Sequence, residues 1–185
     1  VFSHDGKMIA WERMERDGYE ADKIRLMVHS FESGKTEYMT PDFDQNVGGL
    51  KFSNDDKWIY FVSDFHAVDN IYKINLADKA IKQITSGVHD YTSVDFAEGG
   101  KLIAQNMSMS HPIEIWSVDE KTQEQKKIST CNDELMAKIK WGKVEERWFK
   151  ATDGKDLQTW VIYPPDFDST KSYPTLLYCE GGPQS

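Results

Sequence analysis

Three stretches decide the fold of this chain: FSHDGKMIAW at residues 2–11, FSNDDKWIYF at residues 52–61 and FAEGGKLIAQ at residues 96–105. They are versions of one unit, and their opening residues Phe2, Phe52 and Phe96 are 50 and 44 positions apart. Each copy continues with a turn, an apolar strand, a polar connection, a second strand, another turn and a third strand that ends near Thr or Ser. Short antiparallel strands that recur every roughly 40 to 50 residues are typical of β-propeller blades. The sequence therefore predicts a mainly β fold with about three blades.

The second copy shows the strand pattern most clearly. Its strands are expected over Trp58–Ser63, Asn70–Leu76 and Ala80–Thr85, and the third copy opens with Thr92–Phe96. In Asn70–Leu76, Tyr72, Ile74 and Leu76 alternate with Ile71, Lys73 and Asn75, which is the period of a strand. Trp58–Val62 is apolar at every position, which indicates a strand that is covered on both faces.

Three blades do not close a ring, because propellers need roughly four to eight. Two blade faces would lack neighbours, so we expect self-association of the fragment, or else a dimer of the intact protein. Among its 185 residues, 22 Lys and Arg face 31 Asp and Glu, for a net charge of −9, which argues against a nucleic-acid partner. No membrane span is expected, because no apolar run approaches the roughly 18 residues required. The compartment stays open, with the periplasm or secretion slightly favoured over the cytoplasm.

Metal and cofactor sites are not predicted. Cys131 and Cys179 are 48 residues apart, and the five histidines are scattered, so neither a zinc site nor a disulfide framework is supported.

One connection between predicted strands is unusually charged, because eight of the twelve residues from Glu12 to Lys23 are charged. It has two interpretations, a solvated loop between strands or a loop that overhangs a cavity.

The repeat stops after Trp141. Residues Val144–Asp168 predict a hairpin that turns at Asp153-Gly154. Tyr173–Cys179 is a continuous apolar stretch that runs into Glu180-Gly181-Gly182-Pro183, as in a central strand of a parallel sheet. We therefore predict two domains, a partial propeller over residues 1–142 and the first strands of an α/β-hydrolase domain over residues 143–185.

These features together carry a family resemblance. The FSxDGK-type repeats, the segment TDGKDLQTWVIYPPDFD at residues 152–168 and YPTLLYCEGGPQS at residues 173–185 resemble the propeller–hydrolase junction of the prolyl oligopeptidase family of serine peptidases. The similarity is to its dipeptidyl peptidase IV and acylaminoacyl-peptidase branches, and it covers essentially the whole chain. It implies an α/β-hydrolase with a Ser-Asp-His triad, under a propeller that restricts access to short peptides.

The resemblance assigns the loop of Glu180, Gly181 and Gly182 to the oxyanion hole, where backbone amides must approach the reacting oxygen closely. Relatives usually carry His or Tyr where this chain has Glu180, and an ionised carboxylate cannot donate a hydrogen bond. Glu180 is instead expected to have a structural role, to bind a substrate amine or to pair with a cation. The chain contains no GxSxG motif, so the triad is absent from it.

Other candidates for catalysis or substrate binding are weaker. Ser108, Ser110 and His111 lack a strained turn, and Ser185 is the last residue of the sequence. Glu145 and Glu146 are expected to form a solvated pair on opposite faces of a strand. The leading interpretation is thus a fragment, inactive alone, of a dipeptidyl aminopeptidase-like exopeptidase or oligopeptidase that cleaves short peptides by acyl transfer. The alternative is a non-catalytic propeller that binds partners and resembles TolB. Dipeptidyl, acylaminoacyl and oligopeptidase specificities all stay open.

Overall fold

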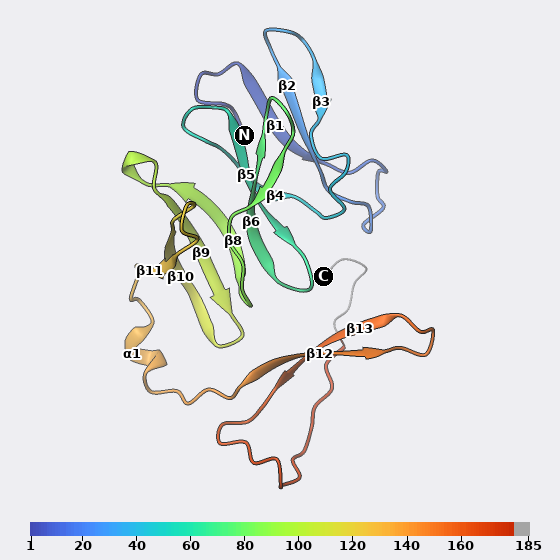
Figure 1. Cartoon of the computed structure of the whole chain (residues 1–185), viewed down its shortest axis with the longest axis vertical. Coiled ribbons are helices and arrows are strands. Elements are labelled where there is room, and N and C mark those ends of the chain that lie inside the picture. The colour runs from blue at the N-terminus through green and yellow to red at the C-terminus, as the bar shows by residue number, and fades with distance from the viewer. Residues whose placement is uncertain (180–185) are drawn as a thin grey trace.

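The computed structural model describes residues 1–179, and strands dominate it (Figure 1). The first repeat contains β1 (Met8–Arg13), β2 (Arg25–Ser30) and β3 (Thr36–Tyr38). The second contains β4 (Gly48–Phe52), β5 (Trp58–Asp64), β6 (Asp69–Asn75) and β7 (Ile81–Gln83). The third contains β8 (Asp90–Phe96), β9 (Leu102–Ser108), β10 (His111–Val118) and β11 (Gln125–Lys127). Each repeat is an antiparallel sheet with its strands in chain order, as the sequence predicts.

The second and third repeats are joined at one edge. A single parallel pair, Asp69 with Asp90, connects β6 to β8, so the eight strands hydrogen-bond as one sheet. In the first repeat, the opening strand is reduced to a bridge between Phe2 and Ile9. Figure 1 shows the three repeats side by side, with the hairpin of β12 (Val144–Lys150) and β13 (Asp156–Ile162) at one end of them.

Two hydrophobic clusters hold the repeats together. The cluster between repeats 1 and 2 contains Ile59 and Phe61 of β5, and the one between repeats 2 and 3 contains Tyr60. Successive residues of β5 therefore point into different clusters, as the period of a strand requires. Ile59 and Phe61 are fully buried and Tyr60 is 4% exposed, so the prediction that this strand is covered on both faces is confirmed.

The repeat turns share one hydrogen-bond pattern. In the first, Ser3 Oγ donates to Asp5 Oδ1 and accepts from the Met8 amide; in the second, Ser53 does the same with Asp55 and Trp58. The second turn also binds the first, because the Asp56 carboxylate accepts hydrogen bonds from the amides of His4 and Asp5. The similar sequences thus fold into similar turns, and adjacent repeats are linked through them.

The charged connection between β1 and β2 is organised by one carboxylate. Asp22 is 4% exposed and accepts hydrogen bonds from the amides of Glu15 and Arg16 at 2.6 and 2.8 Å. The loop is therefore folded around this carboxylate, and both interpretations of it stay open.

Helix is scarce in the described residues. A single turn of 3₁₀-helix spans Glu98–Gly100, and α1 covers only Asp133–Met136. None of the helices in this part of the chain is long and apolar enough to cross a membrane.

The expected hydrolase segment is observed only in part. The predicted hairpin forms, and the Gly154 amide donates to Ala151 O in its turn. The strand predicted over Tyr173–Cys179 is absent, and Leu176 and Leu177 are 98% and 88% exposed. A strand needs a neighbour for its backbone groups, and no strand among residues 1–179 pairs with this segment. An α/β sheet is therefore not observed, and the 142/143 boundary stays a prediction.

Candidate functional site

The candidate catalytic residues do not come together in the described part of the chain. Glu180, Gly181 and Gly182 lie outside the described residues. Ser108 Oγ accepts a hydrogen bond from the Ser110 amide, and His111 Nδ1 lies 3.1 Å from Pro112 O. Between residues 1 and 179, no serine hydroxyl is hydrogen-bonded to a histidine ring, which a serine nucleophile with its base requires.

Cysteine and metal chemistry also find no arranged site there. Cys131 and Cys179 are both free and exposed. Within the described range, no group of three His, Cys, Asp or Glu side chains is arranged to hold a metal ion.

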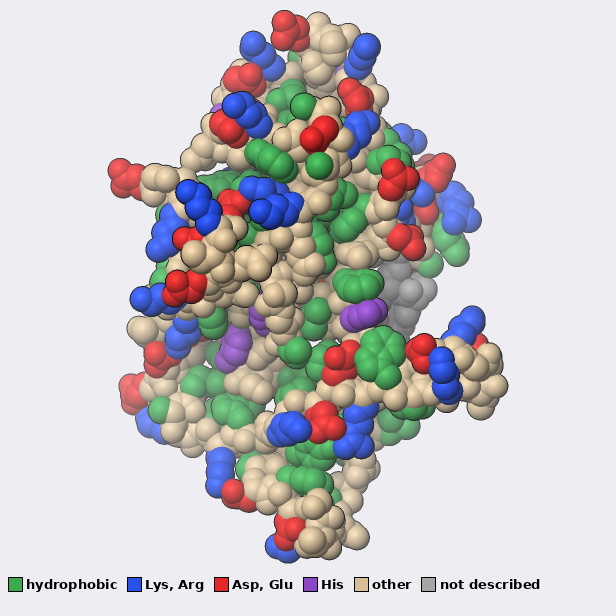
Figure 2. Space-filling view, in the orientation of Figure 1, with side chains coloured by type: hydrophobic (Ala, Val, Ile, Leu, Met, Phe, Trp, Pro, Cys, Tyr) green, Lys and Arg blue, Asp and Glu red, His purple; other side chains and the backbone are tan. Residues whose placement is uncertain are grey.

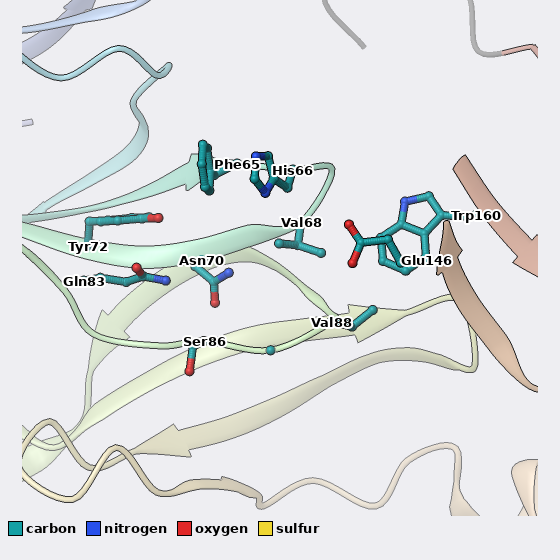
Figure 3. Close-up of a pocket in the computed structure, with 11 residues that line it drawn as sticks. Phe65, His66, Val68, Asn70, Tyr72, Gln83, Ser86, Val88, Glu146 and Trp160 are labelled. Atoms are coloured by element: carbon teal, nitrogen blue, oxygen red, sulfur yellow. The ribbon is translucent and has the colours of Figure 1, made fainter. Parts of the chain in front are cut away.

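A cavity of about 260 Å³ lies between the second repeat and the hairpin (Figure 3). The β5–β6 turn, β6 and the connection from β7 to β8 supply one wall, and β12 and β13 supply the other. The lining residues are Phe65, His66, Val68, Asn70, Tyr72, Gln83, Ser86, Gly87, Val88, Glu146 and Trp160. Figure 3 shows Glu146 and Trp160 at one end, facing Val68 and Val88.

The hairpin is fastened to the second repeat at this cavity. Gln158 Nε2 donates to His66 O at 2.7 Å and to Glu146 Oε1 at 2.8 Å. Glu146 Oε1 also accepts a hydrogen bond from Trp148 Nε1 at 2.7 Å, and the Trp148 ring meets the His66 ring edge-on. The two contacts with His66 join residues 92 and 82 positions apart in sequence, and they fix the orientation of the hairpin.

Glu145 and Glu146 differ in their surroundings. Glu145 forms ion pairs with Lys143 and Arg147, whose hydrogen bonds lower the pKa of its carboxyl group. Glu146 lines the cavity and accepts hydrogen bonds from two side chains. Glu146 is exposed and Glu145 is half-buried, so both carboxylates remain in contact with solvent, and Glu146 in addition faces the cavity.

Carboxylates crowd the strand ends beside the cavity. Asp69 is opposite Asp64 on β5 and opposite Asp90 on β8. Burial raises the pKa of Asp69 to about 6, and the charges of Asp90 and Asp64 add to the shift. Burial also lowers the pKa of His89, whose Nε2 lies 3.2 Å from Asn70 Oδ1. Negative charge at this corner therefore costs stability at neutral pH.

The cavity has the chemistry of a binding or packing site rather than of a catalytic one. Its walls offer aromatic rings, the Glu146 carboxylate and the Trp160 indole, whose buried Nε1 has no hydrogen-bond partner among the described residues. The Asn70 amide is already engaged, because its Oδ1 accepts from Thr85 Oγ1 at 3.0 Å. No lining hydroxyl or thiol in this part of the chain is held by a base, so the walls show no arranged nucleophile.

Sequence reasoning did not find this cavity. Its residues come from four segments, and the first and last of them are 95 positions apart. The available signal was the presence of Trp148 and Trp160 in the predicted hairpin, since large aromatic side chains usually pack against other residues.

Comparison with known proteins identifies relatives of the chain and structures that share its fold. No protein-family model matches it. It is 41% identical over all 185 residues to dipeptidyl-peptidase 5 of Porphyromonas gingivalis, and it spans only 27% of that relative. The acylaminoacyl peptidase of Pyrococcus horikoshii shares the fold, with a TM-score of 0.70 and 22% identity over 86% of this chain and 24% of that one.

Two further structures resemble the repeat region. The β-propeller domain of the trilobed protease of Pyrococcus furiosus matches with a TM-score of 0.55 and 22% identity, over 70% of this chain and 38% of that one. TolB of Acinetobacter baumannii also has a TM-score of 0.55, with 20% identity, over 89% of this chain and 37% of that one. The repeats are therefore propeller-like, and the predicted recognition is confirmed: over its whole length the chain is homologous to about a quarter of the dipeptidyl-peptidase 5 proteins, within the prolyl oligopeptidase family.

Proposed function

We propose that the protein to which this chain belongs is a serine peptidase that removes dipeptides from the free amino ends of short peptides. The single observation that carries this proposal is the 41% identity to a dipeptidyl-peptidase 5 across the whole chain. An identity of this size over both the repeats and the hairpin favours a shared function more than a shared scaffold alone. The chain spans about a quarter of such relatives, so the activity belongs to the longer protein.

The position of the hairpin supports a gating role for the propeller. The hairpin packs against the β5–β6 turn and the β7–β8 connection, which lie at the same end of the second repeat. We infer that the hydrolase domain begins at this end and covers it. Peptides would then reach the active site through or beside the propeller, which admits short chains and excludes folded proteins.

The chemistry assigned to the longer protein is acyl transfer. A serine hydroxyl attacks the peptide carbonyl while a histidine accepts its proton, and the same histidine then protonates the leaving amine. In the second half of the reaction, water attacks the ester between the serine and the dipeptide, which releases the dipeptide with a free carboxyl group and restores the serine hydroxyl. Gly181 and Gly182 are proposed to bring backbone amides to the oxyanion. Because the chain contains no GxSxG motif, the 185 residues alone are expected to be inactive.

Labelling and hydrolysis by the full-length protein test this proposal. A fluorophosphonate probe should label one serine, and prior labelling should abolish hydrolysis of dipeptidyl-coumarin substrates. An N-acetylated version of the same dipeptide is the matched control and should be cleaved at least tenfold more slowly. Faster cleavage of the acetylated substrate would instead favour an acylaminoacyl peptidase.

The alternative is a non-catalytic binding propeller, and the likeness to TolB supports it for the repeats. It predicts no labelling and no hydrolysis of either substrate. The hairpin and its contacts with the second repeat speak against it, since a propeller that only binds partners does not need them.

A further inference from the structure

A second hollow, which we call the lysine groove, opens between the second and third repeats. It measures about 700 Å³ and is separate from the cavity at the hairpin. Strands β6 and β7 form one side, and the turns and strand ends of the third repeat form the other. The lining residues are Lys73, Lys82, Gly100, Lys101, Leu102, Ser117, Val118, Asp119, Glu120, Lys121, Glu124 and Lys126.

The floor of the groove is a closed network. Tyr60 OH donates to Glu120 Oε1 at 2.6 Å, and Lys73 forms an ion pair with the same carboxylate. Burial and the Glu120 charge raise the pKa of the Tyr60 hydroxyl, so it stays a donor at neutral pH. Glu120 is therefore occupied by partners from the second repeat and does not neutralise the other lysines.

The walls carry unbalanced positive charge. Lys82, Lys101, Lys121 and Lys126 are exposed, and none of their ammonium groups has an acidic partner among residues 1–179. Asp119 is engaged by the amides of its own turn, from Lys121 and Thr122. Five lysines thus line the groove against three carboxylates, in a chain whose net charge is −9.

One pair of lysines in the groove destabilises the sheet in which it lies. Lys73 on β6 is directly opposite Lys82 on β7, and like charges opposite each other destabilise a sheet. Local conflicts of this kind are expected where a surface serves a function. An anionic ligand in the groove would relieve the repulsion.

We propose that the lysine groove binds an acidic segment of a polypeptide partner, a run of Asp or Glu residues whose carboxylates meet Lys82, Lys101, Lys121 and Lys126. The open shape admits an extended chain, and separate ammonium groups suit separate carboxylates along it. Nucleic acid is disfavoured, because the overall charge of −9 repels a phosphate backbone beyond the groove. This inference is independent of the proposed peptidase activity.

Fluorescence anisotropy of the full-length protein tests the proposal. The probe is octaglutamate with fluorescein on its amino end and an amidated carboxyl end, in 50 mM NaCl. The test variant is Lys82→Glu with Lys126→Glu, and the control is Lys7→Glu with Lys35→Glu, which makes the same charge change on exposed lysines that lie outside the groove. We expect the test variant to bind at least tenfold more weakly and the control to stay within twofold of wild type.

Three results would overturn the proposal. They are no binding by the wild type, an equal loss in both variants, or tighter binding of a duplex DNA of the same charge. Lys101→Gln with Lys121→Gln is a second test variant with a milder change, for use if the charge reversals impair folding, as circular dichroism would show.

Discussion

Gly34, Lys79 and Gln123 occupy the same turn position in the three repeats. Their φ angles are 67°, 61° and 60°, and the amide of each donates to the carbonyl four residues earlier. Glycine adopts this conformation freely, whereas a residue with a Cβ is strained there by about 1 kcal/mol. The third repeat therefore carries strain that the first avoids.

Gln123→Gly in the full-length protein should raise the free energy of unfolding. The expected gain is about 0.5 kcal/mol, because relief of strain exceeds the added entropy of the unfolded chain. Urea denaturation measures it, and Gly34→Ala should shift the midpoint in the opposite direction. An unchanged or lower midpoint for Gln123→Gly would show that the turn is not strained.

The raised pKa of Asp69 predicts that the stability of the folded protein depends on pH. Its pKa is about 6 in the folded chain and 3.8 when unperturbed. Between these values the folded state keeps a proton that the unfolded state releases, so the contribution of Asp69 to stability falls as pH rises through this window. Asp69→Asn should thus raise the melting temperature at pH 7.5, and the gain should fade by pH 4.5.

The control for this pH effect is Asp42→Asn, an exposed aspartate. Its substitution should leave the melting temperature nearly unchanged at both pH values. A gain for Asp69→Asn that is equal at pH 7.5 and 4.5 would contradict electrostatic crowding by Asp64 and Asp90.

At the scale of elements, one hydroxyl recurs in each repeat. Thr40 Oγ1 accepts from the Leu26 amide, Thr85 Oγ1 from the Ile71 amide and Ser129 Oγ from the Ile115 amide. Each hydroxyl follows the last strand of its repeat and continues the pairing with the neighbouring strand. The Thr or Ser at the end of each predicted third strand is therefore explained by the backbone hydrogen bond that its hydroxyl accepts.

Thr85→Val keeps the side-chain shape and removes this hydroxyl. Because Thr85 is 1% exposed, the Ile71 amide would lose its partner in the interior, which costs about 1–3 kcal/mol. Chemical denaturation should show the loss. Thr92→Val, at an exposed hydroxyl that bonds only Gln105, should cost less than half as much.

The elements also show what the sequence could predict. The repeat strands and the hairpin follow from local periodicity and turn residues, and both were predicted. The prediction of a strand over Tyr173–Cys179 is wrong for the described residues. Its apolar pattern is typical of a buried strand, and no other strand among residues 1–179 lies beside it. The cavity and the lysine groove depend on side chains from separate repeats, whose meeting is set by packing and not by any local pattern.

At the scale of the whole molecule, exposed apolar side chains predict association of the 185-residue chain. Figure 2 shows hydrophobic side chains at the surface of the lower part of the molecule, and Trp148, Phe149 and Ile162 of the hairpin are 46%, 51% and 65% exposed. Light scattering should give a mass above 21.3 kDa.

Leu176→Lys with Leu177→Lys tests the contribution of the final segment to this association. These side chains are the most exposed large hydrophobic residues described, so the double variant should associate less. A monodisperse monomer of the unchanged chain would contradict the prediction.

The central claim concerns the longer protein, and product analysis tests it most directly. A hexapeptide with a free amino end is incubated with the full-length protein and followed by mass spectrometry. The account predicts sequential release of dipeptides from the amino end, and protection of the same peptide after acetylation. No cleavage, or release of a blocked residue from the acetylated peptide, would contradict it.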